Sequence, residues 1–333
     1  METSKEDRLN GIGLEGSTLS QLGLDWEPQS VIAQYDFNGI KRKASNIHLI
    51  INGKTGEPLA AASSDWKPLG NRDFFSRSQK AFAKAGVSIE RGGYSHGAKQ
   101  SLRSGDRCVF LISEDVPQLA YNLFDDDKEV YHSRLVFYNH HHPGFGLGAK
   151  LYYTRLVCKN GAIASRVVKG NVFAHTEKGV EKHKAAISNL FGFERIIIQN
   201  KFEQEALAQT KIDDDDAIDF LVKNYGEKDK ELKEQPTAIR TMVGLYHGDY
   251  SRINEDVDLG INEYTQNTAY GILQSVTAYY THLKTYGSSD SRIRNQLFLN
   301  PAQSLQNSLI RAFVPRSHQE HIQQQIGVAL RSM

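Results

Sequence analysis

The spacing of apolar residues changes in the middle of the chain, and this change restricts the fold more than any other feature. Two runs rich in β-branched and aromatic residues, Leu151–Cys158 and Val167–Ala174, are separated by a polar break that contains Asn160-Gly161. Asn-Gly tolerates positive φ and so indicates a tight turn between two antiparallel strands. After Thr176 the apolar residues recur at helical spacing. The sequence therefore predicts an α+β protein: a curved antiparallel sheet from the N-terminal half with packed helices, followed by a helical C-terminal region.

The same change divides the 333 residues into three predicted parts. These are a flexible arm over residues 1–23, a β-rich core over 24–176 and a helical region over 177–333, packed on or beside the core. In the core, alternation and turn residues predict strands and one helix, at Ser30–Tyr35, Asn46–Ile51, Leu59–Ser63, Asp73–Ala85 (the helix), Val87–Arg91, Asp106–Ser113, Ser133–His141, Ala149–Cys158 and Val167–Ala174. In the last part, helical spacing predicts Gly179–Phe191, Glu194–Gln209, Ala217–Tyr225, Thr237–Tyr246, Asn267–Tyr286, Pro301–Phe313 and His318–Arg331.

Composition limits the classes of partner. Hydrophobic residues make up 39% and charged residues 24% of the chain, which is typical of a globular protein. The net charge of +1 means that any site for a polyanion must be a local patch. No run of about 18 apolar residues occurs, and the polar N-terminus lacks the apolar core of a signal peptide. We therefore expect a cytoplasmic protein with no membrane contact, in which Cys108 and Cys158 are buried thiols.

Motifs that carry catalytic chemistry are missing from the sequence. It contains no phosphate-binding GxxxxGK[ST] loop and no GxSxG nucleophile motif. The glycine-rich segment Gly144–Gly148 precedes a predicted strand, whereas a dinucleotide-binding loop precedes a helix. The sequence therefore favours a protein that is not an enzyme and has no cofactor.

Two clusters of metal-ligand residue types have simpler interpretations. Adjacent histidines at His140–His142 would alternate between the faces of a strand, so at most two of them can converge on one ion. We interpret them as a polar strand end and loop. The run Asp213–Asp216 lacks the glycine and the distal glutamate of a calcium loop, and carboxylates at this position suit the start of a helix. We expect no metal site at either cluster.

Basic residues mixed with aromatic residues on strands and their loops form the remaining candidate site. Single-stranded nucleic acid requires this mixture, because cations contact its phosphates and flat rings stack on its bases. A basic triplet precedes the hairpin at Asn46–Ser63, and further basic and aromatic residues occupy the loop Gly92–Ser104 and the strand that begins at Ala149. The predicted nucleic-acid contacts are Lys41, Arg42, Lys43, Tyr94, Lys99, Arg103, Tyr153 and Arg155.

Three stretches of the sequence, in this order, resemble a known family. They are Ala61–Leu69 with Asn71–Phe75, then Arg155–Gly161 with His175-Thr176, and then Asn267–Gly271 with Val276–His282. The chain resembles domain of unknown function 932, a family typical of phages and plasmids, from about Leu24 to Phe313. Gly161 and Thr281 depart from the family pattern, which often has threonine and aspartate at these places.

The resemblance implies a mobile-element protein encoded near replication or recombination genes, and it implies no catalytic residue. The predicted order of sheet and helices is similar in outline to proteins that anneal single strands, although a fold does not determine a function. We therefore expect a non-catalytic single-stranded DNA-binding or annealing protein that assists replication or recombination, as a homo-oligomer. One alternative is an interaction or structural component, such as a virion protein or a host-factor antagonist, with a host or phage protein as its partner. Another is a metal-dependent nuclease that uses the aspartate clusters.

Overall fold

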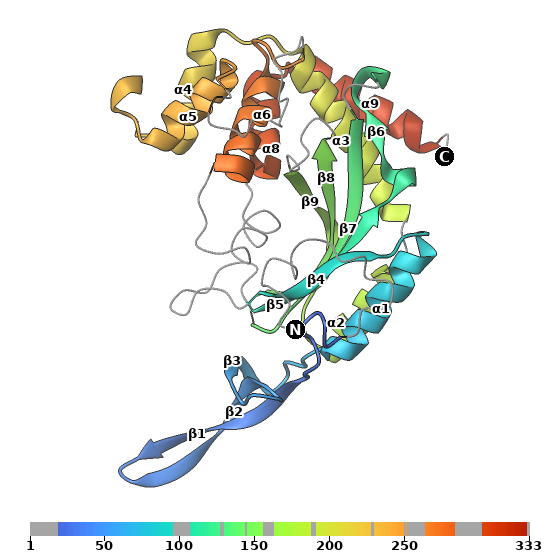
Figure 1. Cartoon of the computed structure of the whole chain (residues 1–333), viewed down its shortest axis with the longest axis vertical. Coiled ribbons are helices and arrows are strands. Elements are labelled where there is room, and N and C mark those ends of the chain that lie inside the picture. The colour runs from blue at the N-terminus through green and yellow to red at the C-terminus, as the bar shows by residue number, and fades with distance from the viewer. Residues whose placement is uncertain are drawn as a thin grey trace, which may run out of the picture.

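The structure is a computed structural model that describes residues 19–95, 107–126, 130–143, 145–155, 163–187, 191–227, 230–249, 251, 264–283 and 302–331. Within these ranges, antiparallel sheets lie in the N-terminal half of the chain and most helices in the C-terminal half, which confirms the predicted α+β class. The strands divide between two open sheets (Figure 1). The predicted turn at Asn160-Gly161 lies outside the described residues, as does Cys158.

The first sheet has the strand order β1-β2-β3, with β1 at Pro28–Phe37, β2 at Ile40–Asn52 and β3 at Pro58–Ser63. The hairpin of β2 and β3 is the one that the sequence predicts. Asn38 and Gly39 join β1 to β2, and both have positive φ, 55° and 76°. Such a two-residue turn matches the twist of paired strands. Figure 1 shows the β1–β2 hairpin (blue) projecting away from the second sheet and the helices.

The second sheet has the order β4-β5-β7-β8-β9, with the short strand β6 paired to β7. Its strands are β4 Ile89–Ser95, β5 Cys108–Asp115, β6 Tyr121–Asn122, β7 Val130–His140, β8 Leu147–Arg155 and β9 Ile163–Phe173. The sequence predicts a loop from Gly92, but β4 continues through Gly92 and Gly93 to Ser95. A Cβ atom on Gly92 would lie 2.5 Å from the Leu111 side chain, so glycine here permits close packing rather than ending the strand.

The helices follow the predicted ranges closely. They are α1 Asn71–Lys84, α2 Glu177–Ile187, α3 Phe191–Gln209, α4 Asp214–Tyr225, α5 Thr237–Tyr246, α6 Ala269–Ala278, α8 Ala302–Phe313 and α9 Arg316–Arg331. The predicted helix Asn267–Tyr286 instead begins at Ala269 and passes into a π-helical turn at Tyr279–Leu283. Asp213 precedes α4 but makes no side-chain cap hydrogen bond. None of the helices in the described ranges combines the length and apolar character needed to cross a bilayer.

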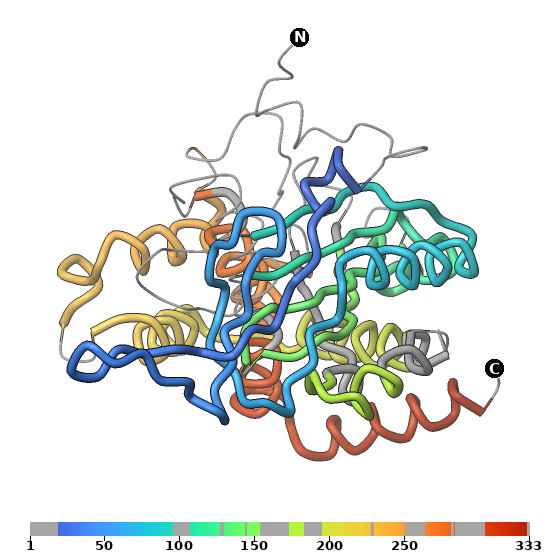
Figure 2. The backbone as a smooth tube through the Cα atoms, turned by 90° about the horizontal axis from the view of Figure 1, so that it is seen from below, coloured from blue at the N-terminus to red at the C-terminus, as the bar shows by residue number. Residues whose placement is uncertain are grey.

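The main core lies between one face of the second sheet and the helices. Alternation places Leu135, Phe137 and Leu151 on this face, and all three are fully buried. The ring of Phe137 stacks on Phe82 of α1 at 4.7 Å between centroids. In the view from below, α1 (cyan) runs beside the sheet and α9 (red) lies along the outside of the molecule (Figure 2). Strands and C-terminal helices therefore share one hydrophobic core. Cys108 is a buried thiol, as predicted.

Candidate nucleic-acid interface

The far end of the β1–β2 hairpin carries the basic triplet that the sequence singled out. We call this end, Gln34–Lys43, the arm. It lies beyond a register shift in the β1–β2 pairing and beyond the part of β2 that pairs with β3. All ten of its residues are exposed. Lys41, Arg42 and Lys43 therefore lie within the arm itself, and not merely before a hairpin.

The pairing of the arm gives it two faces of different chemistry. Phe37 pairs with Ile40 and Tyr35 pairs with Arg42, and side chains two positions apart on a strand share a face. One face therefore consists of Tyr35, Phe37, Ile40 and Arg42. The intervening pairs form the opposite, polar face, which consists of Gln34, Asp36, Lys41 and Lys43. The three cations of the triplet are thus divided between the two faces.

Local interactions hold the arm in shape. The N–H of Gly39 donates to Oδ1 of Asp36 at 2.8 Å across the turn. The guanidinium of Arg42 lies 5.5 Å from the centroid of the Phe37 ring, within the range of a cation–π interaction. An isolated two-stranded hairpin has little stability of its own, so these contacts favour a fixed tip.

Neither of the two predicted tyrosine contacts is a surface ring. Tyr153 is 0% exposed and faces the main core, where its ring contacts Tyr121 edge-on, so the prediction that it stacks on a base is wrong. Tyr94 is partly buried near the base of the hairpin, and its ring meets Trp26 edge-on at 5.1 Å. Burial raises the pKa of the Tyr94 hydroxyl above its ordinary value.

The remaining predicted contacts are not brought together by the described residues. Lys99 and Arg103 lie outside them, and Arg155 ends β8 with a side chain whose placement is not described. In their place the structure brings Tyr35 and Phe37 beside the triplet. The signal for these two was present in the sequence, because Asn38-Gly39 follows an alternating strand and marks a hairpin.

A compact joint connects the hairpin to the second sheet. The carboxylate of Glu27 accepts hydrogen bonds from the N–H groups of Asn71 and Arg72, at 2.8 and 3.0 Å, and so caps α1 from outside. The Asn71 amide donates to the Trp26 carbonyl at 2.7 Å, and its Oδ1 accepts from His141 Nε2 at 2.9 Å. The base of the hairpin, α1 and β7 are therefore tied together by polar contacts.

Buried histidines belong to this joint. The rings of His175 and Trp66 lie 4.6 Å apart, and the N–H of Lys67 donates to the His175 carbonyl at 2.7 Å. β7 ends at His140 and His141 begins the following loop, as predicted, but both side chains are buried rather than exposed. Burial, together with the neighbouring His175 and His140, lowers the pKa of His141 to about 3. Burial likewise lowers the pKa of His175 to about 4.

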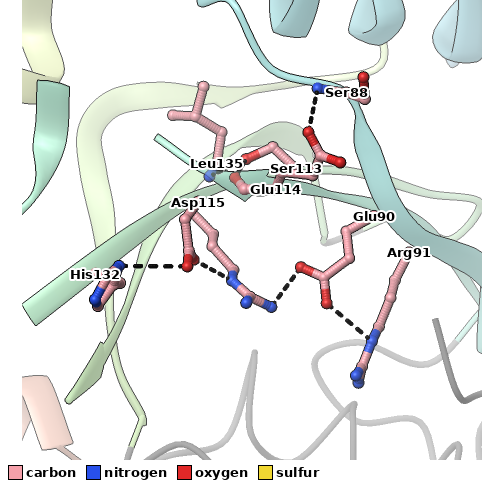
Figure 3. Close-up of polar contacts among 9 residues, drawn as sticks. Ser88, Glu90, Arg91, Ser113, Glu114, Asp115, His132 and Leu135 are labelled. Carbon is pink, nitrogen blue, oxygen red and sulfur yellow. Dashed lines mark hydrogen bonds and ion pairs between the residues drawn. The ribbon is translucent and has the colours of Figure 1, made fainter. Parts of the chain in front are cut away.

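A second charged cluster lies on the face of the second sheet that is turned away from α1. The guanidinium of Arg134 lies 2.5 Å from Oε2 of Glu90 and 2.6 Å from Oδ1 of Asp115. The other carboxylate oxygen of Asp115 lies 3.3 Å from Nδ1 of His132 (Figure 3). Arg91 pairs with the other oxygen of Glu90 at 3.5 Å. Because each cation here already has a carboxylate partner, the cluster offers little attraction to a polyanion.

Lys150 on the same sheet face is also unsuited to a phosphate. It is almost completely buried, and its ammonium lies 5.3 Å from the centroid of the Tyr138 ring. Burial lowers the pKa of Lys150 to about 8. Among the described residues, no three His, Cys, Asp or Glu side chains are grouped so that they could hold a metal ion. Among the residues that the structure describes, the arm is therefore the best candidate for a contact with nucleic acid.

One stretch that carries the family resemblance has a structural explanation. The hydroxyl of Thr268 accepts the N–H of Gly271 at 3.0 Å and so caps α6. Tyr270 is fully buried, and its hydroxyl bonds to that of Tyr131 on β7. A Cβ atom on Gly271 would collide with the carbonyl oxygen of Thr265. These residues position α6 against the sheet, so capping and packing explain the residue types of this motif.

Comparison with known proteins gives a family and no further relative. Residues 58–310 match the family described as Domain of unknown function (DUF932). Sequence analysis places the start of this resemblance near Leu24, but the whole of β1 and β2, the arm included, precedes the matched segment. The chain matches no curated protein and no solved structure. Because the match covers more than half of the chain, the protein belongs to the DUF932 family.

Proposed function

We propose that the protein binds single-stranded DNA through the arm and takes part, without catalysis, in replication or recombination of a phage or plasmid. The cytoplasm is the proposed site of action. The observation that carries this proposal is the exposed arm face on which Tyr35 and Phe37 lie beside Arg42. The mobile-element context rests on the family resemblance alone.

The chemistry of the arm suits a flexible polyanion with flat bases. Stacking of one base on an aromatic side chain contributes about 1–3 kcal/mol, and every base has a face that can stack. Arg42 supplies positive charge beside the two rings, and Lys41 and Lys43 supply it on the opposite face of the same hairpin. The one acidic residue of the arm, Asp36, accepts a hydrogen bond inside the turn. The arm therefore combines a local positive charge with stacking faces on a chain whose overall charge is close to neutral.

A single arm can contact only a short piece of single-stranded DNA. Its four residue pairs span about 13 Å, at about 3.3 Å per residue, which leaves room for few nucleotides. Several copies bound to one strand would raise the overall affinity without new contacts, because the second copy binds at a high effective concentration. A homo-oligomer that presents several arms along one strand is therefore part of the proposal.

A protein partner is the second candidate ligand. The exposed side chains in the part of the β1–β2 hairpin outside the arm favour it. Val31, Ile32 and Ile47 are large apolar side chains that remain exposed there. Exposed apolar groups that cluster on one element often mark a protein interface. Capture of one host or phage protein by the full chain, lost in a Val31→Ser/Ile32→Ser variant and kept in Lys41→Ala/Arg42→Ala/Lys43→Ala, would favour this candidate.

Removal of the basic triplet is expected to weaken DNA binding and its salt dependence together. A Lys41→Ala/Arg42→Ala/Lys43→Ala variant loses up to three phosphate contacts, which lowers the log–log salt slope for a single strand by about 2 and the affinity at 0.1 M salt roughly 10–100-fold. Fluorescence anisotropy of a labelled single-stranded oligonucleotide at several salt concentrations measures both quantities.

The matched control removes three exposed cations that lie outside the arm. Lys80, Lys178 and Lys182 lie on α1 and α2, and their replacement by alanine changes the net charge by the same amount. This variant is expected to keep the wild-type salt slope. An equal loss of affinity in both variants would show that total charge, and not the arm, attracts the strand.

A further inference from the structure

The residues on either side of the arm's turn are unusually exposed for apolar side chains. Phe37 is 55% and Ile40 57% exposed, and they pair with each other across the two strands. They therefore form an apolar edge at the extreme end of the hairpin, two residues apart along the chain from Tyr35 and Arg42. Large apolar groups held in water at a projecting tip indicate a contact that buries them.

The tip is also prepared for such a contact. The Asn38-Gly39 turn and the hydrogen bond from Gly39 to Asp36 set the backbone, and Arg42 lies over one side of the Phe37 ring. Binding by a preorganised tip loses less conformational entropy than binding by a flexible loop. Phe37 and Ile40 can therefore enter a narrow space as one unit.

We infer that the Phe37–Ile40 tip is a wedge that inserts between neighbouring base pairs, so that the arm binds duplex DNA in a groove as well as single strands. This inference rests on the proposed function, because it assigns the arm to nucleic acid. It extends the ligand from a strand laid on one face to a base-paired step that the tip partly unstacks. Apolar side chains inserted in this way kink a duplex.

The distribution of charge supports a groove. A single strand whose bases stack on the aromatic face meets Arg42 directly, and it reaches Lys41 and Lys43 on the opposite face only by wrapping around the edge of the hairpin. A groove of duplex DNA has phosphates along both walls, and the major groove admits a two-stranded ribbon. Cations on both faces of the arm, with an apolar tip between the strands, therefore match a groove better than they match one isolated strand.

The same arrangement argues against an apolar groove on a protein as the occupant of the tip. Three cations follow the tip within three residues of Ile40. Burial of unpaired cations against an apolar surface is costly. Phosphates would instead compensate these charges while Phe37 and Ile40 reach the bases.

The test uses the full chain and a duplex with 2-aminopurine at a central step and a pair of fluorophores at its ends. Binding of the wild type is expected to raise the 2-aminopurine fluorescence, because the base unstacks, and to shorten the distance between the ends. Phe37→Ala/Ile40→Ala is expected to lose both signals and to bind the duplex about tenfold more weakly. Lys41→Ala/Lys43→Ala is expected to bind more weakly but to keep both signals at saturation.

Val328→Ala is the control, because Val328 on α9 is a similarly exposed apolar residue, at 59%. It should leave both signals unchanged.

If the wild type binds a single strand with a strong salt dependence but does not change 2-aminopurine fluorescence in the duplex, the inference that the tip is a wedge is wrong and the proposed function stands. If the wild type binds no nucleic acid at low salt, the inference and the proposed function both fail. If Phe37→Ala/Ile40→Ala keeps both signals, the wedge is not at the tip.

Discussion

A shift from pH 7 to pH 4.5 is expected to lower the free energy of unfolding by about 5 kcal/mol through His141 and His175 alone. Burial lowers the pKa of these side chains to about 3 and about 4 in the folded state, against about 6.5 in the unfolded chain. Below pH 6.5 the unfolded state therefore binds more protons than the folded state. The stability that the neutral rings provide is complete above pH 6.5 and is lost as the pH falls, at about 1.4 kcal/mol per pH unit for each histidine.

Urea unfolding between pH 7 and pH 4.5 measures this loss. His175→Gln removes one of the two groups and is expected to reduce the pH-dependent loss by about half, whatever it does to stability at pH 7. His321→Gln removes an exposed histidine of α9 and is expected to follow the wild-type curve. Identical pH slopes for the wild type and His175→Gln would contradict the buried, neutral state of His175.

Gly271→Ala is expected to lower the free energy of unfolding by about 3 kcal/mol, because the new methyl group clashes with packed neighbouring atoms. On one side it meets the carbonyl oxygen of Thr265, and on another the Tyr246 ring, whose Cε2 lies 3.2 Å from the Cβ position. The backbone at Thr265 cannot retreat without moving the capped start of α6, and Tyr246 is buried. Thermal and urea unfolding would report the change.

A second helical glycine provides the matched comparison. A Cβ atom on Gly327, within α9, has nothing within 4 Å. Gly327→Ala is therefore expected to be neutral or to stabilise the protein by about 0.5–1 kcal/mol, since alanine favours a helix interior. A similar loss for both variants would mean that the close approach at Gly271 does not restrict this position.

Helices and strands whose apolar residues recur at a regular spacing, or which border a recognisable turn, could be predicted from the sequence. The helix Thr237–Tyr246 was placed correctly because Pro236 precedes a helically spaced apolar stripe. The β2–β3 hairpin followed from its glycine-containing turn. The predicted elements do not include the β1–β2 hairpin, although Asn38-Gly39 is the same kind of signal, because the basic triplet after it is placed before a hairpin and not in a returning strand.

Burial could not be predicted from local pattern. Alternation places Tyr153 and Lys150 on opposite faces of β8, but it does not say which face meets the helices, and in the structure Tyr153 faces the core. The contact between Trp66 and His175 is likewise set by the packing of distant segments. The arm's two faces required the register of β1 against β2, which depends on the turn.

Binding of single-stranded DNA by the arm is tested most directly by the affinity for a single-stranded oligonucleotide with and without the arm. Fluorescence anisotropy over a series of salt concentrations would compare the wild type with a variant in which Gln34–Lys43 is replaced by Asn-Gly. We expect micromolar or tighter binding by the wild type, with a log–log salt slope of about 2 or more, and the loss of most of this binding when the arm is shortened. Equal binding by the shortened variant, or no binding by the wild type at low salt, would contradict this expectation.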